Sequence, residues 1–122
     1  MHLFVYGTLK RGESRHRFLA GQTFVAPART RPLYRLHDLG DFPGLVESSV
    51  GLTIEGELWE VDEACLLRLD RIEGCDMGLY RRALVELASP HDALSAVTYL
   101  YEKNIDGLAD CGTHWRGDRR EW

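Results

Sequence analysis

The sequence predicts one α+β domain, with short strands arranged around a single amphipathic helix. Three observations support this class. A chain of 122 residues is too short for two independent hydrophobic cores. Short apolar segments alternate with turns that contain Gly or Pro, and residues 63–73 show a helical pattern with capping residues at both ends. We therefore expect one domain over residues 1–122, with residues 102–122 as a charged C-terminal tail.

The first third of the chain predicts a buried strand, a loop bounded by glycines and a helical turn. Residues 2–6 are apolar, aromatic or β-branched and stop at a glycine, which is typical of a buried strand that runs into a tight loop. The loop covers residues 7–12, and residues 15–19 follow as one helical turn. Two prolines interrupt residues 23–36, which predicts an edge strand or an irregular ribbon.

The remaining strands are predicted from alternation and from turn residues. The cluster at 40–44 contains Gly and Pro and predicts a turn. Residues 52–61 alternate apolar and acidic side chains and predict a half-exposed strand, with Trp59 on the acidic side. Two further strands are expected at 84–88 and 96–101, joined by a turn at 89–92. In the charged tail, Trp115 and Trp122 are expected to act as anchors.

The helix over residues 63–73 carries the first candidate for chemistry. Asp62 suits an N-cap and Gly74 suits the position just after a helix end. The apolar stripe of this helix contains Cys65, Leu66, Leu69 and Ile72, and Glu73 falls within the same stripe. A carboxyl group in an apolar wall has a raised pKa, which suits a general acid/base. Two alternatives stay open: the helix frays at Glu73, or its carboxylate forms an ion pair with Arg81 or Arg82.

The loop over residues 7–12 carries the second candidate. Its G-x-x-x-x-G spacing after a strand is that of a phosphate loop, but Glu13 and Ser14 stand where a lysine would have to meet the phosphates. Exposed backbone N–H groups in such a loop are able to hold a carbonyl or carboxylate group. The alternative is an ordinary glycine turn.

Charge and composition argue against several other classes of function. Residues 1–36 contain seven Lys/Arg residues and one acidic residue, whereas residues 37–80 contain two Lys/Arg residues and eleven acidic residues. The basic residues lie on a turn and on strand-like segments without interleaved aromatic residues, so we interpret them as a solvated face and expect no nucleic-acid partner. The longest apolar run, residues 3–6, is far shorter than the ~20 residues that span a bilayer. We expect a cytoplasmic protein without a membrane partner.

The metal-ligating and nucleophilic residue types form no complete pattern. The three cysteines show no C-x-x-C pair and are expected to be reduced thiols. Cys111 and His114 make only half of a metal site, and there is no G-x-S-x-G elbow. We therefore expect no metal and no cofactor.

Four blocks, in this order along the chain, resemble the γ-glutamylcyclotransferase-like superfamily. They are residues 6–12 (YGTLKRG), followed by His16 and Leu19, then 56–62 (GELWEVD), 69–74 (LDRIEG) and 80–82 (YRR). The likeness covers about residues 1–101. The first block most resembles the γ-glutamylamine cyclotransferase branch, and the short chain is similar to small bacterial relatives.

The resemblance implies a fold and a set of site residues. The fold would be a small mixed β-barrel flanked by short helices, with a pocket where the loop after the first strand meets the helix. By this resemblance Tyr6, Gly7, Thr8 and Leu9 match the substrate-binding loop, and Glu73 matches the catalytic acid/base. Tyr80 is expected to line the same pocket, and residues 40–44 its wall.

The expected activity follows from the resemblance together with these residues. The α-amine of a γ-glutamyl amide would attack its own γ-carbonyl group, releasing 5-oxoproline and a free amine. The alternative is a non-catalytic module of the same fold that binds a small anion or a partner. If the acidic residues of 37–80 lie near the pocket mouth, a cationic leaving group such as lysine should be favoured over glutathione. The oligomeric state is not predicted.

Overall fold

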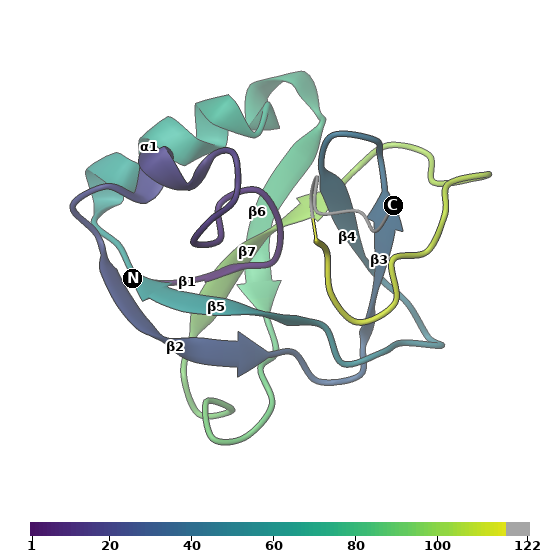
Figure 1. The fold of residues 1–122 in the computed structure, drawn as a ribbon, viewed down its shortest axis with the longest axis horizontal. Helices are drawn as coiled ribbons and strands as arrows, with labels where there is room; N and C mark the ends of the chain where they lie inside the picture. The colour runs from purple at the N-terminus through teal and green to yellow at the C-terminus, as the bar shows by residue number, and fades with distance from the viewer. Residues whose placement is uncertain (117–122) are drawn as a thin grey trace.

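The computed structural model describes residues 1–116 and shows a curled mixed sheet that forms a half-barrel, with one α-helix packed against it (Figure 1). The strands and helices in chain order are β1 (His2–Val5), the 3₁₀ turn η1 (His16–Leu19), β2 (Thr23–Arg29), β3 (Tyr34–Asp38), β4 (Pro43–Glu47), β5 (Glu55–Glu60), α1 (Glu63–Ile72), the 3₁₀ turn η2 (Cys75–Met77), β6 (Tyr80–Val85) and β7 (Ala96–Tyr101). The expected α+β class is confirmed. Within residues 1–116, no helix has the length and apolar character needed to cross a bilayer.

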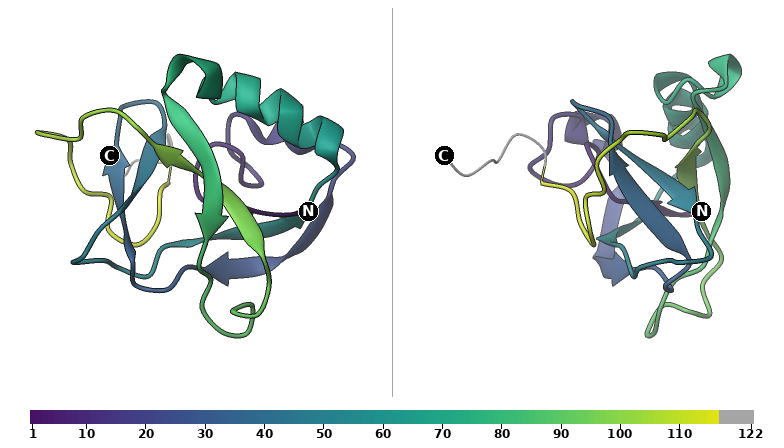
Figure 2. Two further views of the ribbon diagram at one scale, coloured as in Figure 1. Left: turned by 180° about the vertical axis from the view of Figure 1, so that it is seen from behind. Right: turned by 90° about the vertical axis from the view of Figure 1, so that its right-hand side faces the viewer.

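Strand β7 organises the sheet, because three strands pair with it. The sheet order is β2-β5-β1-β7-β4-β3, and β6 lies off this path as an antiparallel partner of β7. Strand β6 descends from the end of α1 and runs alongside β7 (Figure 2). Both β1 and β4 are parallel to β7. Strand β1 pairs with the first two residues of β7, whereas β4 pairs only with Leu100 near the end of β7. The two strands thus diverge from β7 near its middle.

Tyr6 fills the gap that this divergence leaves. Its hydroxyl group donates to the carbonyl oxygen of Tyr99 at 2.6 Å and accepts from the backbone N–H of Leu45 at 3.3 Å. A side chain therefore joins β4 to β7 where no ladder bond can form. Such pairing is required because unpaired polar groups are costly in a buried sheet.

Both faces of the sheet are buried. One apolar cluster, including Phe4 and Leu58, fills the inside of the half-barrel, and a second, including Leu3 and Trp59, faces α1. The expectation that Trp59 would lie on a half-exposed side is therefore wrong: it is 5% exposed. Alternation along β5 indicated two faces, but it could not indicate that an aromatic cluster covers the second one.

Four predicted strands and turns differ from the structure. The region 23–36, expected to be one edge strand or an irregular ribbon, contains the edge strand β2 and the start of a second edge strand, β3. Strand β5 begins at residue 55, not 52, and the strand expected at 84–88 is β6 over 80–85. The turn expected at 40–44 ends early, because residues 43–47 form β4.

The sequence predicts a turn where β4 begins, because the first two residues of this strand are Pro and Gly. A proline is tolerated at the first position of a strand, where Pro43 lies. Gly44 is required by packing, since a Cβ atom there would come within 2.8 Å of the Tyr101 Cβ. Turn-forming residue types therefore occur here for reasons of strand entry and close contact.

The helix follows the sequence prediction closely. The Asp62 carboxylate accepts from the backbone N–H of Cys65 at 2.7 Å, which confirms the N-cap. Gly74 adopts the left-handed conformation, with φ of 68°, and ends α1. The side chains of Cys65, Leu66 and Leu69 are buried against the sheet.

The segment after β7 returns across β3 toward the front of the molecule (Figure 1). The backbone N–H of Asp38 donates to the carbonyl oxygen of Ala109, and that of Cys111 donates to Leu36. Trp115 then enters the apolar cluster inside the half-barrel with 7% exposure, as expected of an anchor. Trp122 lies outside the described residues.

Candidate active site

A pocket opens where β1 and β4 diverge from β7. It contains about 370 Å³ of empty space, part of it open to solvent. Its lining comes from the end of β1 and the following loop, from the start of β4, from the end of α1, and from β6 and β7, and comprises Phe4, Val5, Tyr6, Gly7, Thr8, Leu9, Arg15, Phe42, Pro43, Glu73, Tyr80, Thr98 and Tyr99. All six residues predicted for the site, Tyr6, Gly7, Thr8, Leu9, Glu73 and Tyr80, are among them.

Glu73 lies at the end of α1 and its side chain is almost completely buried. Its backbone N–H donates to the carbonyl oxygen of Leu69 at 2.8 Å, so the helix does not fray before this residue. Burial raises the pKa of the Glu73 carboxyl from 4.5 to about 7, and the positive charge of Arg15 opposes this effect only in part. A carboxyl group with this pKa is able both to accept and to return a proton near neutral pH.

The expected alternative, an ion pair between Glu73 and Arg81 or Arg82, is not formed. Arg81 pairs with Glu47 at 3.3 Å, and Arg82 pairs with Asp70 at 3.4 Å. Both arginines lie on β6 with their side chains turned outward, whereas Glu73 lines the pocket. Desolvation rather than pairing thus determines the state of this carboxyl group.

The pKa of Glu73 implies a specific dependence of stability on pH. The folded protein holds this proton more tightly than the unfolded chain, so the contribution to stability is complete below about pH 4.5 and is lost as the pH rises through about 7. The loss is on the order of 3 kcal/mol. We expect the free energy of unfolding of the wild-type protein, relative to Glu73→Gln, to fall across this interval in urea titrations. A difference between the two proteins that does not change with pH would contradict the raised pKa.

The loop between β1 and η1 is compact and leaves three backbone donors available. Two backbone hydrogen bonds close the loop. The N–H of Lys10 donates to the carbonyl oxygen of Gly7 at 3.1 Å, and the N–H of Arg15 donates to the carbonyl oxygen of Thr8 at 2.8 Å. Within residues 1–116, the N–H groups of Gly7, Thr8 and Leu9 donate to no protein acceptor. These groups are able to bind a carboxylate or a polarised carbonyl oxygen.

Gly7 is required here by close packing. A Cβ atom on residue 7 would come within 2.6 Å of the Pro43 Cγ and 2.7 Å of its Cδ. The loop therefore lies directly against the first residue of β4. This contact places the backbone donors of the loop at the pocket wall.

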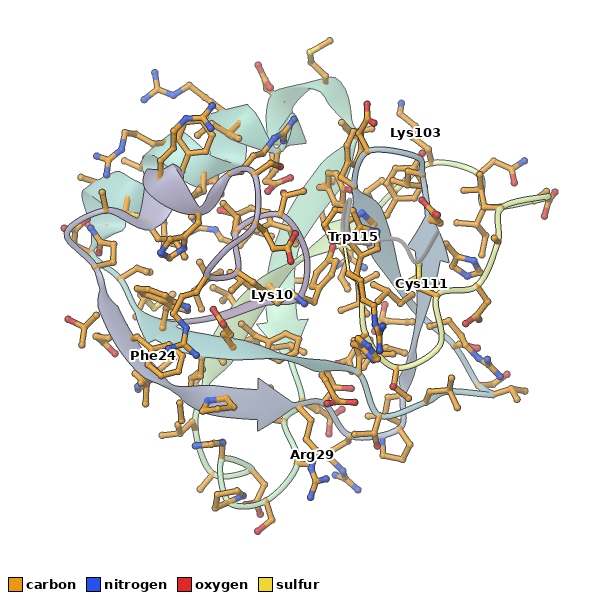
Figure 3. The ribbon with its side chains drawn as sticks, viewed as in Figure 1. Lys10, Phe24, Arg29, Lys103, Cys111 and Trp115 are labelled. Atoms are coloured by element: carbon orange, nitrogen blue, oxygen red, sulfur yellow. The ribbon has the colours of Figure 1, made fainter. Side chains whose placement is uncertain are left out.

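Contacts with other elements hold the outer part of the loop. The guanidinium group of Arg11 binds Glu57 at 3.1 Å and lies 3.6 Å from the ring centroid of Phe24. Lys10 Nζ donates to the carbonyl oxygen of Trp115 at 2.8 Å, and Figure 3 shows Lys10 directed toward Trp115. The segment after β7 thus contacts the loop that lines the pocket.

The two predicted tyrosines have structural hydrogen bonds of their own. The hydroxyl group of Tyr80 donates to the carbonyl oxygen of Pro43 at 2.7 Å, and that of Tyr6 donates to Tyr99. Burial raises both pKa values, and the negative charge of Glu73 adds to this effect. Both groups thus stay neutral. Since both donor hydrogens are used, each oxygen meets a substrate only as an acceptor.

Sequence reasoning missed several residues of the pocket. Thr98 and Tyr99 lie in an apolar strand without any functional pattern, and their place in the pocket depends on where β1 leaves β7. The sequence places Arg15 only in a helical turn. The expectation that residues 40–44 form a pocket wall is confirmed for Phe42 and Pro43. Nothing in the local sequence indicated that Arg15 lines the pocket beside Glu73.

The residues considered as metal ligands do not assemble into a site. Within residues 1–116, no group of three His, Cys, Asp or Glu side chains is arranged to hold a metal ion. Cys111 packs against the interior cluster, whereas His114 lies 3.9 Å from Glu55.

Comparison with known proteins gives consistent results. Residues 3–117 match the family model described as gamma-glutamyl cyclotransferase, AIG2-like. A protein of Vibrio cholerae named as a gamma-glutamylcyclotransferase is 38% identical to this chain over 112 residues. The match covers 90% of this chain and 91% of that protein. The gamma-glutamylaminecyclotransferase of Rattus norvegicus is 38% identical over 91 residues, 68% of this chain and 61% of that protein. An AIG2-like protein of Mus musculus superposes with a TM-score of 0.79 at 27% identity, covering 98% and 96% of the two chains.

Proposed function

Because the chain belongs to the gamma-glutamyl cyclotransferase, AIG2-like family, we propose that it cleaves γ-glutamyl amides by intramolecular cyclisation, with Glu73 as the acid/base. The observation that carries the proposal is the position of Glu73: the residue is 9% exposed, it lies in the pocket lining, and burial raises the pKa of its carboxyl group to about 7. The resemblance of residues 6–12 to the γ-glutamylamine branch, and the match to the rat protein, support an amine as the leaving group.

The reaction requires one proton carrier. The Glu73 carboxylate takes a proton from the substrate's α-ammonium group, and the resulting amine attacks the γ-carbonyl carbon. A new C–N bond closes the five-membered ring. Glu73 returns this proton to the leaving nitrogen as the bond between that nitrogen and the γ-carbon breaks. The ring nitrogen gives up its second proton through Glu73 to the departing amine, which leaves as an ammonium ion. No water and no co-reactant is consumed, and the products are 5-oxoproline and a free amine.

The loop supplies the electrostatic part of the mechanism. Negative charge develops on the γ-carbonyl oxygen as the ring closes, and fixed backbone donors stabilise such charge without reorganisation. The N–H groups of Gly7, Thr8 and Leu9 are the donors in this proposal. Since nucleophile and electrophile belong to one molecule, holding it in a folded conformation supplies much of the remaining advantage.

The direct test is to assay for 5-oxoproline. The purified protein would be incubated with a panel of γ-glutamyl amines, γ-glutamyl dipeptides and glutathione, and 5-oxoproline would be quantified by chromatography. Release of 5-oxoproline with an equal amount of free amine is expected for at least one member. Binding without turnover across the panel would favour the non-catalytic alternative.

We expect turnover to survive exhaustive chelation. The proposed mechanism polarises the carbonyl group with backbone donors, and no three-ligand group is present among the described residues. Activity after dialysis against EDTA should equal that of the untreated enzyme. Loss of activity that one divalent ion restores would contradict the mechanism.

A further inference from the structure

We infer that Arg15 selects substrates whose leaving amine carries a carboxylate, because it lies in the pocket lining and forms no ion pair with a carboxylate among residues 1–116. This inference rests on the proposed function, since it assigns the part of the substrate that Arg15 binds. Arg15 then acts as a specificity-determining residue.

The backbone and side chain of Arg15 are both held at the pocket. Its N–H donates to the carbonyl oxygen of Thr8 at 2.8 Å, which places residue 15 beside the predicted substrate loop. Its guanidinium carbon lies 5.6 Å from the ring centroid of Phe42, a second residue of the lining. Such a contact orients a cation without neutralising its charge.

Three arginines outside this pocket are each paired with a carboxylate. Arg11 pairs with Glu57 at 3.1 Å, Arg35 pairs with Asp110 at 3.2 Å, and Arg81 pairs with Glu47 at 3.3 Å. Within residues 1–116, Arg15 has no carboxylate oxygen within 4.0 Å. Apart from its electrostatic interaction with Glu73, its charge is therefore available to an incoming anion.

The charge of the pocket lining gives no support to a cationic leaving group. Of the eleven acidic residues in 37–80, only Glu73 lines the pocket. Arg15 is the other charged residue of the lining, and its charge acts on both Glu73 and Tyr80. Glu73 is neutral or ionised according to pH, whereas an arginine stays charged, so the pocket retains a permanent positive charge.

The residues that line the pocket differ in burial. Glu73, Tyr80 and Thr8 are 9%, 3% and 7% exposed, whereas Arg15 and Phe42 are half-buried. The reacting γ-glutamyl end requires Glu73 and the loop donors, so it occupies the buried part. The leaving group then extends past the more exposed Arg15 and Phe42. A carboxylate on that group would meet the guanidinium as a charge-assisted pair.

The test compares two substrates that differ only in this charge. γ-Glutamylglycine carries a carboxylate on its leaving group, and γ-glutamylglycinamide carries an isosteric neutral amide. In the wild-type enzyme we expect kcat/KM to favour γ-glutamylglycine by about tenfold to a hundredfold, as for one hydrogen-bonded charge. In Arg15→Gln the ratio should fall toward one, and in the wild type it should narrow at high salt.

Arg17→Gln is the matched control. Arg17 is an exposed cation in the adjacent turn, hydrogen-bonded to the carbonyl oxygen of Ser14, and it does not line the pocket. The substitution removes the same charge and should preserve the substrate ratio. An equal loss on both substrates in Arg15→Gln would show that Arg15 serves the γ-glutamyl end, and an unchanged ratio would show that it selects neither. Either result overturns the inference.

Calorimetric binding separates this inference from the proposed reaction. If neither compound yields 5-oxoproline, the proposed catalysis is wrong, but the dissociation constants of the same two compounds still decide the role of Arg15. Preferential binding of γ-glutamylglycine that is lost in Arg15→Gln and kept in Arg17→Gln supports the inference without turnover. Equal affinity of the wild-type protein for both compounds, or no binding of either, overturns it.

Discussion

Glu73→Gln is expected to reduce 5-oxoproline formation by roughly 10²–10⁴-fold, because the amide keeps the shape of the side chain but cannot carry a proton. The loss should appear in kcat, since the reacting end of the substrate still fits the pocket. Rates would be measured with the best substrate of the γ-glutamyl panel. Circular dichroism and urea unfolding should show a folded protein that is at least as stable as the wild type near neutral pH, since it lacks a buried charge.

A control on the same helix separates local charge from catalysis. Glu63 lies in the exposed first turn of α1, far along the helix from residue 73 and outside the pocket lining. Glu63→Gln should retain wild-type kcat. Wild-type turnover in Glu73→Gln would refute the mechanism, and unfolding of that variant would show that the carboxyl group is needed for structure.

Gly7→Ala is expected to reduce kcat/KM by about a hundredfold, because misplacement of a binding loop by about 1 Å can have an effect of this size. The added Cβ atom would lie 2.6 Å from the Pro43 Cγ, so either the loop or the start of β4 must move. Backbone donors that no longer point at the γ-carbonyl oxygen lose their effect on the developing charge. Steady-state kinetics of the folded variant would measure the loss.

A second substitution tests whether this loss arises from the steric contact. Pro43→Ala removes the Cγ and Cδ atoms that the new methyl group would meet, and it keeps the carbonyl oxygen that accepts from Tyr80. The double variant Gly7→Ala/Pro43→Ala should recover a large part of kcat/KM relative to Gly7→Ala, with Pro43→Ala alone as the reference. If the double variant is no better than Gly7→Ala, the close contact with Pro43 is not the cause.

The sequence alone determined the local features of the site. The helix, its N-cap at Asp62 and its end at Gly74 follow from residue types within one or two turns of each other. The place of Glu73 on the apolar stripe follows from the same periodicity. The loop after β1 was also recognisable, because a short apolar strand followed by glycine is a local pattern.

Sequence patterns were misleading where a residue type serves a long-range contact. Residues 43–47 begin with Pro and Gly, which indicate a turn, yet they form a buried strand because Gly44 packs on Tyr101. Trp59 was expected on a half-exposed face, but the cluster beneath α1 covers it. In both cases the deciding neighbour, Tyr101 for Gly44 and Phe24 for Trp59, lies on another strand, so no local pattern records it.

Only the tertiary structure brought Glu73, Arg15 and the loop donors into one pocket. Periodicity shows which side of a helix or strand is apolar, but it does not show which element covers that side. That choice depends on β7, where β1 and β4 diverge and Tyr6 bridges the gap. The isolated carboxyl group of a helix end would ionise like any other. Its pKa rises to about 7 because the surrounding loop, strands and aromatic rings exclude water from it.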